Sequence, residues 1–175
     1  MEVFVTFLLN LIYISATLAL IALGLAMVFG LLGVMNMAHG EFVMLGAYSV
    51  YVVQLAGQHF LWAIPVAIVI CVMVGWLMEW LVVRHLYSRP FDTLLATWGV
   101  AILIRKGVEV IFTRDYKSVN QVMPGTIDLL GASYPAYRLL LVALIIVLFV
   151  ALFTWYQKSK AGLKIRAMVQ GPELA

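Results

Sequence analysis

Long uncharged runs dominate this chain. No Asp, Glu, Lys or Arg occurs in residues 3–40, 42–78 or 139–156. An α-helix rises 1.5 Å per residue and the hydrocarbon core of a bilayer is about 30 Å thick, so runs of this length are typical of membrane-spanning helices. The pattern therefore predicts an all-α, polytopic helical membrane protein.

About five spans are expected, and one of them is short. They cover residues 3–33, 42–56 (the short one), 60–83, 93–113 and 139–156. As a helix the first would be about 46 Å long. It is interpreted either as one strongly tilted helix or as a short interfacial helix followed by a span. The polar, turn-rich residues 114–136 are expected to form an extramembrane loop.

Composition narrows the function classes. Apolar residues make up 65% of the chain and charged residues only 11%, whereas roughly a quarter of a soluble domain is charged. These values argue against a disordered chain and against nucleic acid as a partner. The single cysteine, Cys71, lies inside an apolar run and is expected to serve packing.

Basic residues gather in two short segments, 84–90 and 157–175. Cytoplasmic loops carry an excess of Lys and Arg, so both segments are expected in the cytoplasm. With five alternating spans, the loop over 114–136 and the N-terminus then lie outside. The tail, residues 157–175, is also partly amphipathic. Composition leaves open whether it lies on anionic lipid or docks on a cytoplasmic partner.

Asn36, His39 and Glu41 form a polar segment between two apolar runs. Polar groups at membrane depth are costly unless they face protein or water, and non-helical backbone is tolerated there only where it lines a cavity. A broken or re-entrant segment near residues 33–41 is therefore expected, as at the substrate sites of transporters. The alternative is an interfacial turn, wet on one side, in which His39 caps backbone groups.

Further polar or aromatic residues lie in or beside the expected spans. Glu79 comes a turn or so before the basic loop and is interpreted as an ion-pair partner of Arg84 or Arg89. Trp98 is expected to anchor at the membrane interface or to pack at the gap left by Gly99.

Arg105, Lys106 and Glu109 lie late in the fourth expected span. The long basic side chains are expected to snorkel toward the outer headgroups, with a role in substrate conduction as the alternative. No Gly-Lys dipeptide and no His/Cys cluster with metal-ligand spacing occurs. An enzyme, a cofactor and a metal site are therefore not expected.

A specific motif occupies residues 30–48, which read Gly-Leu-Leu-Gly-Val-Met-Asn-Met-Ala-His-Gly-Glu-Phe-Val-Met-Leu-Gly-Ala-Tyr. It closely resembles the signature of the branched-chain amino acid permeases of ABC transporters, a family that includes urea and short-amide permeases. The core Asn-x-Ala-His-Gly-Glu is the specific part. Glu79, Arg89-Pro90, residues 93–99 and residues 162–167 resemble further family positions in the same order, so the resemblance covers nearly the whole chain.

The resemblance implies a permease domain over residues 1–156 and the start of a cytoplasmic coupling loop over residues 157–175. Four residues are implied near the substrate path: Asn36, His39, Glu41 and Trp98. Four residues of the tail are implied to couple to an ATPase: Gly162, Lys164, Arg166 and Ala167. The implied partners are a second permease subunit, two cytoplasmic ATPase subunits and a periplasmic substrate-binding protein, all at a bacterial inner membrane.

Two departures from the family pattern affect these expectations. Arg105-Lys106 replaces a stretch that is usually uncharged. Family members also continue through several more spans, whereas this chain ends at Ala175, so a fragment or a truncated gene is expected. Branched-chain amino acids are the favoured substrates. Urea or short amides are the alternative, because residues 93–99 are especially like urea-type permeases.

Two rival function classes are weighed as well. One is a passive channel, because Asn36-Met-Ala resembles the Asn-Pro-Ala loops of water and glycerol channels. Such channels need two facing loops, and the sequence has no second one. The other rival is a small structural or assembly subunit.

Overall fold

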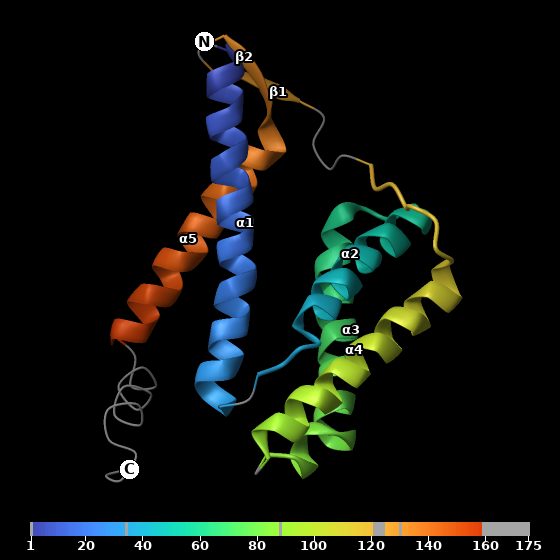
Figure 1. Cartoon of the computed structure of the whole chain (residues 1–175). Coiled ribbons are helices and arrows are strands. Elements are labelled where there is room, and N and C mark those ends of the chain that lie inside the picture. The colour runs from blue at the N-terminus through green and yellow to red at the C-terminus, as the bar shows by residue number, and fades with distance from the viewer. Residues whose placement is uncertain (1, 34, 88, 121–124, 130, 159–175) are drawn as a thin grey trace. The chain divides into compact units, whose positions relative to one another are not determined.

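The structure is a computed structural model that describes residues 2–33, 35–87, 89–120, 125–129 and 131–158 (Figure 1). The α-helices are α1 (Glu2–Leu32), α2 (His39–Leu55), α3 (Ala63–Leu81), α4 (Pro90–Phe112) and α5 (Ala136–Lys158). Short 3-10 helices, η1 (Phe60–Trp62) and η2 (Val83–His85), flank α3. Two strands, β1 (Thr126–Leu129) and β2 (Ala132–Pro135), precede α5. The chain divides into two compact units, Leu25–Val122 and Met1–Gly24 with Met123–Ala175.

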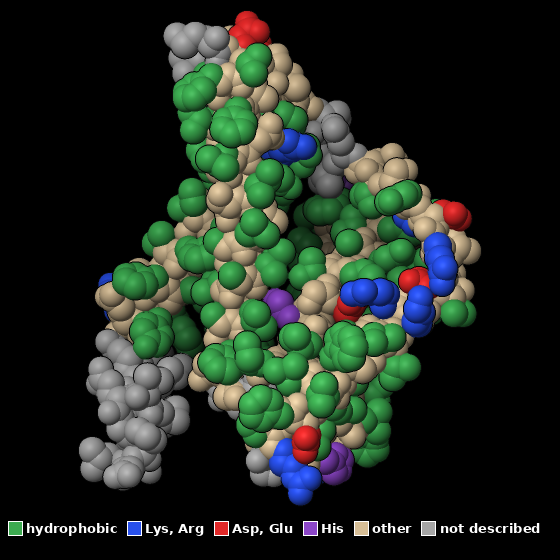
Figure 2. Space-filling model, in the orientation of Figure 1, with side chains coloured by type: hydrophobic (Ala, Val, Ile, Leu, Met, Phe, Trp, Pro, Cys, Tyr) green, Lys and Arg blue, Asp and Glu red, His purple; other side chains and the backbone are tan. Residues whose placement is uncertain are grey.

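The expectation of a polytopic helical membrane protein is confirmed. Within the described residues three helical segments are long and apolar enough to cross a membrane: Glu2–Gly30, Phe60–His85 and Ala136–Lys158. Hydrophobic side chains are spread over the visible surface (Figure 2), and many large apolar residues are exposed, as suits a bilayer environment. Of the two interpretations of the first run, the structure shows a single helix, α1, over Glu2–Leu32.

The unit Leu25–Val122 holds α2, α3 and α4. Its small core contains Ala38, Met78, Val83 and Ala101, with the ring of Phe42 packed against it. Gly75 of α3 also packs closely, because an added Cβ there would lie 3.6 Å from the Phe42 ring. The absence of a side chain at this glycine therefore lets α2 and α3 approach closely.

A buried hydroxyl fixes the start of α4. Thr93 is fully buried, and its Oγ1 lies 2.7 Å from the carbonyl oxygen of Leu86 and 3.0 Å from that of Arg89. Pro90 is the first residue of the helix, where its missing N–H removes no helical hydrogen bond. These contacts tie the basic loop to the first turn of α4.

The second unit contains a feature that the sequence did not predict, the hairpin formed by β1 and β2. The strands pair antiparallel, with Thr126 opposite Pro135 and Leu129 opposite Ala132. Gly131 in the connection has φ +89°, a left-handed conformation that glycine adopts without strain. The 114–136 region is therefore partly β-structure rather than only a turn-rich loop.

A polar cluster connects this hairpin to α1 and α5. Tyr134 is almost fully buried and donates its hydroxyl to Asn10 Oδ1 of α1 over 3.1 Å. Arg138 of α5 donates to the same Oδ1 over 2.7 Å, and its guanidinium lies 5.2 Å from the centre of the Tyr13 ring. Cation–π and amide contacts thus hold this arginine in the first turn of α5.

Candidate functional site

The predicted break between the first two helices is present. The helix α1 ends at Leu32, and Gly33 has φ +66°, so the chain leaves the helix there. The helix α2 begins at His39. The described residues between them are not helical, and we call residues 33–38 the broken segment.

Asn36 organises the broken segment. Its Oδ1 accepts the backbone N–H of Ala38 over 2.9 Å, and its carbonyl accepts the N–H of His39 over 3.3 Å. The carbonyl of Ala38 then accepts the N–H of Glu41 over 3.0 Å. One side chain thus satisfies a backbone donor that the break leaves outside the helical pattern, as buried backbone requires.

Thr97 of α4 holds the same segment from outside. The backbone N–H of Met37 donates to Thr97 Oγ1 over 3.1 Å, and that hydroxyl lies 3.0 Å from the carbonyl oxygen of Leu94. Thr97 is fully buried. Sequence reasoning missed this residue and selected its neighbour Trp98, although Thr93 and Thr97 stand one helical turn apart, which is a signal for a polar stripe on one helix face.

Trp98 lies on a different side of α4. Its side chain is 57% exposed, whereas Thr97 is fully buried. Trp98 and Thr97 are consecutive, and consecutive helical residues point about 100° apart, so they cannot both face α2. Any role for Trp98 in a substrate path therefore stays a prediction.

Glu41 and Arg105 form an ion pair between α2 and α4. Arg105 Nη2 donates to Glu41 Oε1 across 64 positions of the sequence. Glu41 is only 5% exposed, whereas the Arg105 side chain is 62% exposed. Glu41 also lies in the first turn of α2, where a carboxylate complements the helix dipole. The Arg105 guanidinium thus pairs with this buried carboxylate. That its side chain also snorkels toward the headgroups stays a prediction.

The ion pair belongs to a longer line of contacts, which we call the α2–α4 seam. Its members are the pairs Met37–Thr97, Glu41–Arg105, Tyr48–Phe112 and Gln54–Asn120. The tyrosine and phenylalanine ring centres lie 4.8 Å apart, and Gln54 Oε1 accepts the N–H of Asn120 over 2.9 Å. The paired numbers rise together, so α2 and α4 run parallel. Two of the pairs, Glu41–Arg105 and Tyr48–Phe112, join the helices themselves, whereas Met37 precedes α2 and Asn120 follows α4.

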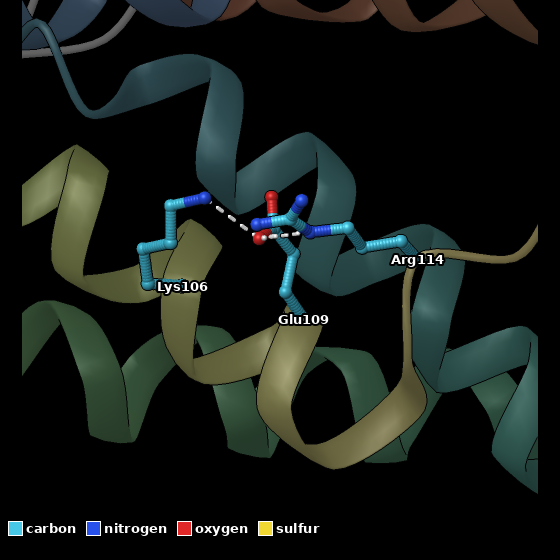
Figure 3. A network of polar contacts seen from close by, with 3 residues as sticks. All are labelled: Lys106, Glu109 and Arg114. Atoms are coloured by element: carbon cyan, nitrogen blue, oxygen red, sulfur yellow. Dashed lines mark hydrogen bonds and ion pairs between the residues drawn. The ribbon is translucent and has the colours of Figure 1, made fainter.

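A second charge network lies at the end of α4. Glu109 Oε2 accepts from Lys106 Nζ over 2.7 Å and from Arg114 Nε over 3.2 Å (Figure 3). All three side chains come from α4 or from the residues that follow it. The neighbouring bases Arg105 and Lys106 therefore have separate acidic partners, one on α2 and one on α4 itself.

The expected pairing of Glu79 with a basic-loop arginine is not found. Within the described residues Glu79 forms no ion pair with Arg84 or Arg89. Arg89, which precedes α4, instead pairs with Asp92 in the first turn of that helix, over 3.6 Å. The chain turns through η2 after α3, so residues close in sequence do not face one another. Glu79 lies with Asn36 and Thr97 in the lining of a cavity of about 110 Å³.

The expected coupling residues cannot be placed. All four lie outside the described residues: Gly162, Lys164, Arg166 and Ala167.

Comparison with known proteins gives one family and several relatives. Residues 7–175 match the family described as the permease component of the branched-chain amino acid transport system. The chain is 25% identical over 183 aligned positions to the high-affinity branched-chain amino acid transport system permease protein LivH of Salmonella typhimurium, covering 95% of this chain and 59% of that protein. No solved structure matches the chain.

Two further relatives carry similar names. The chain is 27% identical to the permease protein BraD of Pseudomonas aeruginosa, over 67% of this chain and 42% of that protein. It is 31% identical to LivH of Escherichia coli, over 58% of this chain and 36% of that protein. The chain thus spans between about a third and three fifths of the length of these relatives.

Proposed function

Because the chain belongs to the family of branched-chain amino acid transport system permease components, we propose that it forms part of the membrane pathway of an ATP-driven amino-acid uptake transporter. The observation that carries this proposal is the family match over residues 7–175. The relatives named above are permease proteins of high-affinity branched-chain amino acid systems, which favours these amino acids over urea as the substrates.

In this proposal the broken segment and the first turn of α2 lie on the substrate path. The path residues of this region are Asn36, His39 and Glu41. Two side chains of α4, Thr97 and Arg105, hold the region in place. Non-helical backbone held by side chains at the junction of two apolar helices is the arrangement that broken-helix transporters use at their sites.

The remaining roles belong to the assembled transporter. Trp98, exposed on α4, would face a second permease subunit across the path. Residues 157–175 would form the first part of the cytoplasmic loop that contacts the ATPase subunits. This part contains Gly162, Lys164, Arg166 and Ala167. A periplasmic binding protein would deliver the amino acid to this complex in a bacterial inner membrane.

Uptake by the reconstituted transporter tests the proposed function. Proteoliposomes that contain the transporter with this chain should accumulate labelled leucine only when the ATPases are supplied with ATP and the binding protein is present. Labelled urea should not accumulate. Accumulation of urea instead of leucine would identify a urea permease, and leucine that equilibrates without ATP would identify a passive channel.

A further inference from the structure

A small, mostly apolar cavity lies beside the broken segment in the unit Leu25–Val122. Its volume is about 110 Å³. Apolar side chains make up most of its wall: Val28, Phe42, Met78 and Val83. Gly75 of α3 also lines the cavity, and a Cβ at this position would lie 3.6 Å from the Phe42 ring.

The volume suits a small branched hydrocarbon group. An engineered apolar cavity of about 150 Å³ binds benzene, which has six carbons. A cavity of 110 Å³ is smaller, and it matches a branched side chain of three or four carbons better than an aromatic ring.

Glu79 is the charged group of the lining. Asn36 and Thr97 also line the cavity, but both already bond to backbone groups of the broken segment. Glu79 is exposed at the edge of this lining, forms no ion pair within the described residues and lies in the last turn of α3. A carboxylate at the negative end of a helix dipole is unfavourable on its own and gains from a nearby cation.

We propose that this cavity is a substrate subsite, in which the branched aliphatic side chain of an amino acid contacts Phe42 and Met78 while its α-ammonium group faces Glu79. The apolar wall recognises the hydrocarbon group and the carboxylate recognises the cation. The inference rests on the proposed function and assigns residues to its substrate specificity.

Narrowing the cavity tests the apolar half of the subsite. Gly75→Val places two methyl groups toward the Phe42 ring. Leucine uptake should fall about tenfold while alanine uptake changes by less than about twofold, since one methylene in a hydrophobic pocket is worth about tenfold or more. The same periplasmic binding protein is used in every assay, so a change in the ratio of leucine uptake to alanine uptake arises in the permease.

Two more variants make this test decisive. Gly75→Ala adds a Cβ at 3.6 Å from Phe42, an ordinary contact, and should shift the ratio in the same direction but less. Gly107→Val is the matched control, because Gly107 lies in α4 outside the cavity with open space around it. An unchanged ratio in both Gly75 variants, or an equal loss of both substrates, would overturn the proposal.

Glu79→Gln tests the charged half. The KM for leucine should rise about tenfold, the usual loss for one charge-assisted hydrogen bond. Glu79→Asp keeps the charge and should restore most of the affinity. A KM that stays the same in Glu79→Gln would overturn the role of Glu79. Failure of the proposed function would look different, because the unaltered transporter would then show no ATP-dependent leucine uptake.

Discussion

Arg105→Ala is expected to lower the amount of folded transporter in the membrane at least about tenfold. Its partner Glu41 is 5% exposed, so the variant leaves a buried carboxylate without its cation. A buried acceptor left without its partner costs roughly 1–3 kcal/mol, and more when it is charged, while 1.4 kcal/mol is about a factor of ten. Fluorescence-detected size-exclusion chromatography of the solubilised transporter measures the folded amount.

The unequal burial of the two partners sharpens this prediction. Glu41→Gln should be much milder, because the Arg105 side chain is 62% exposed and can reach solvent or headgroups. The double variant Glu41→Gln with Arg105→Ala should recover most of the folded amount, since neither charge is then left buried. Lys106→Ala is the matched control and should have little effect, because Glu109 keeps Arg114 as a partner. A double variant as unstable as Arg105→Ala would contradict the account.

Asn36→Ala and Thr97→Val are each expected to lower leucine uptake about tenfold while surface expression stays near normal. Each variant removes the acceptor of one backbone N–H of the broken segment, from Ala38 or from Met37. A donor left without a partner costs roughly 1–3 kcal/mol, enough to displace the segment without unfolding several spans. Uptake and surface expression are measured together.

Two substitutions separate this effect from a general loss of stability. Asn36→Asp keeps the Oδ1 acceptor and should transport nearly as well as the unaltered protein. Thr154→Val removes an exposed hydroxyl of α5 that donates to the carbonyl of Ala151 in its own helix, and it should be neutral. If Asn36→Ala and Thr97→Val both transport normally, the broken segment is only an interfacial turn.

Local sequence patterns were sufficient for the helices and for the break. Uncharged runs predicted α1, α3 and α5, since only a bilayer accommodates them. The polar residues after Gly33 predicted the broken segment. Glycine adopts the positive φ that ends a helix, and the Asn36 side chain accepts the backbone N–H of Ala38, two residues further on. These features depend on residues close together in the chain, so they can be predicted from the sequence.

Contacts between distant residues could not be predicted in the same way. Glu41 meets Arg105, and Met37 meets Thr97, only because α2 and α4 pack in parallel register. The ion pair expected between Glu79 and Arg84 or Arg89 is not formed, because the chain turns through η2 between them. Residues close in sequence therefore need not be close in space. The hairpin at Gly131 was missed because its strands are short and follow a polar stretch.

Protection of a single cysteine by substrate tests most directly whether the broken segment lies on the path. Met37→Cys, in a transporter with Cys71→Ala, places a thiol on this segment and leaves the side chains of Asn36 and Thr97 in place. During ATP-driven turnover, leucine should slow its reaction with a charged methanethiosulfonate reagent severalfold. The exposed control Ser118→Cys should react at the same rate with or without leucine. Equal rates with and without leucine at position 37 would contradict the account.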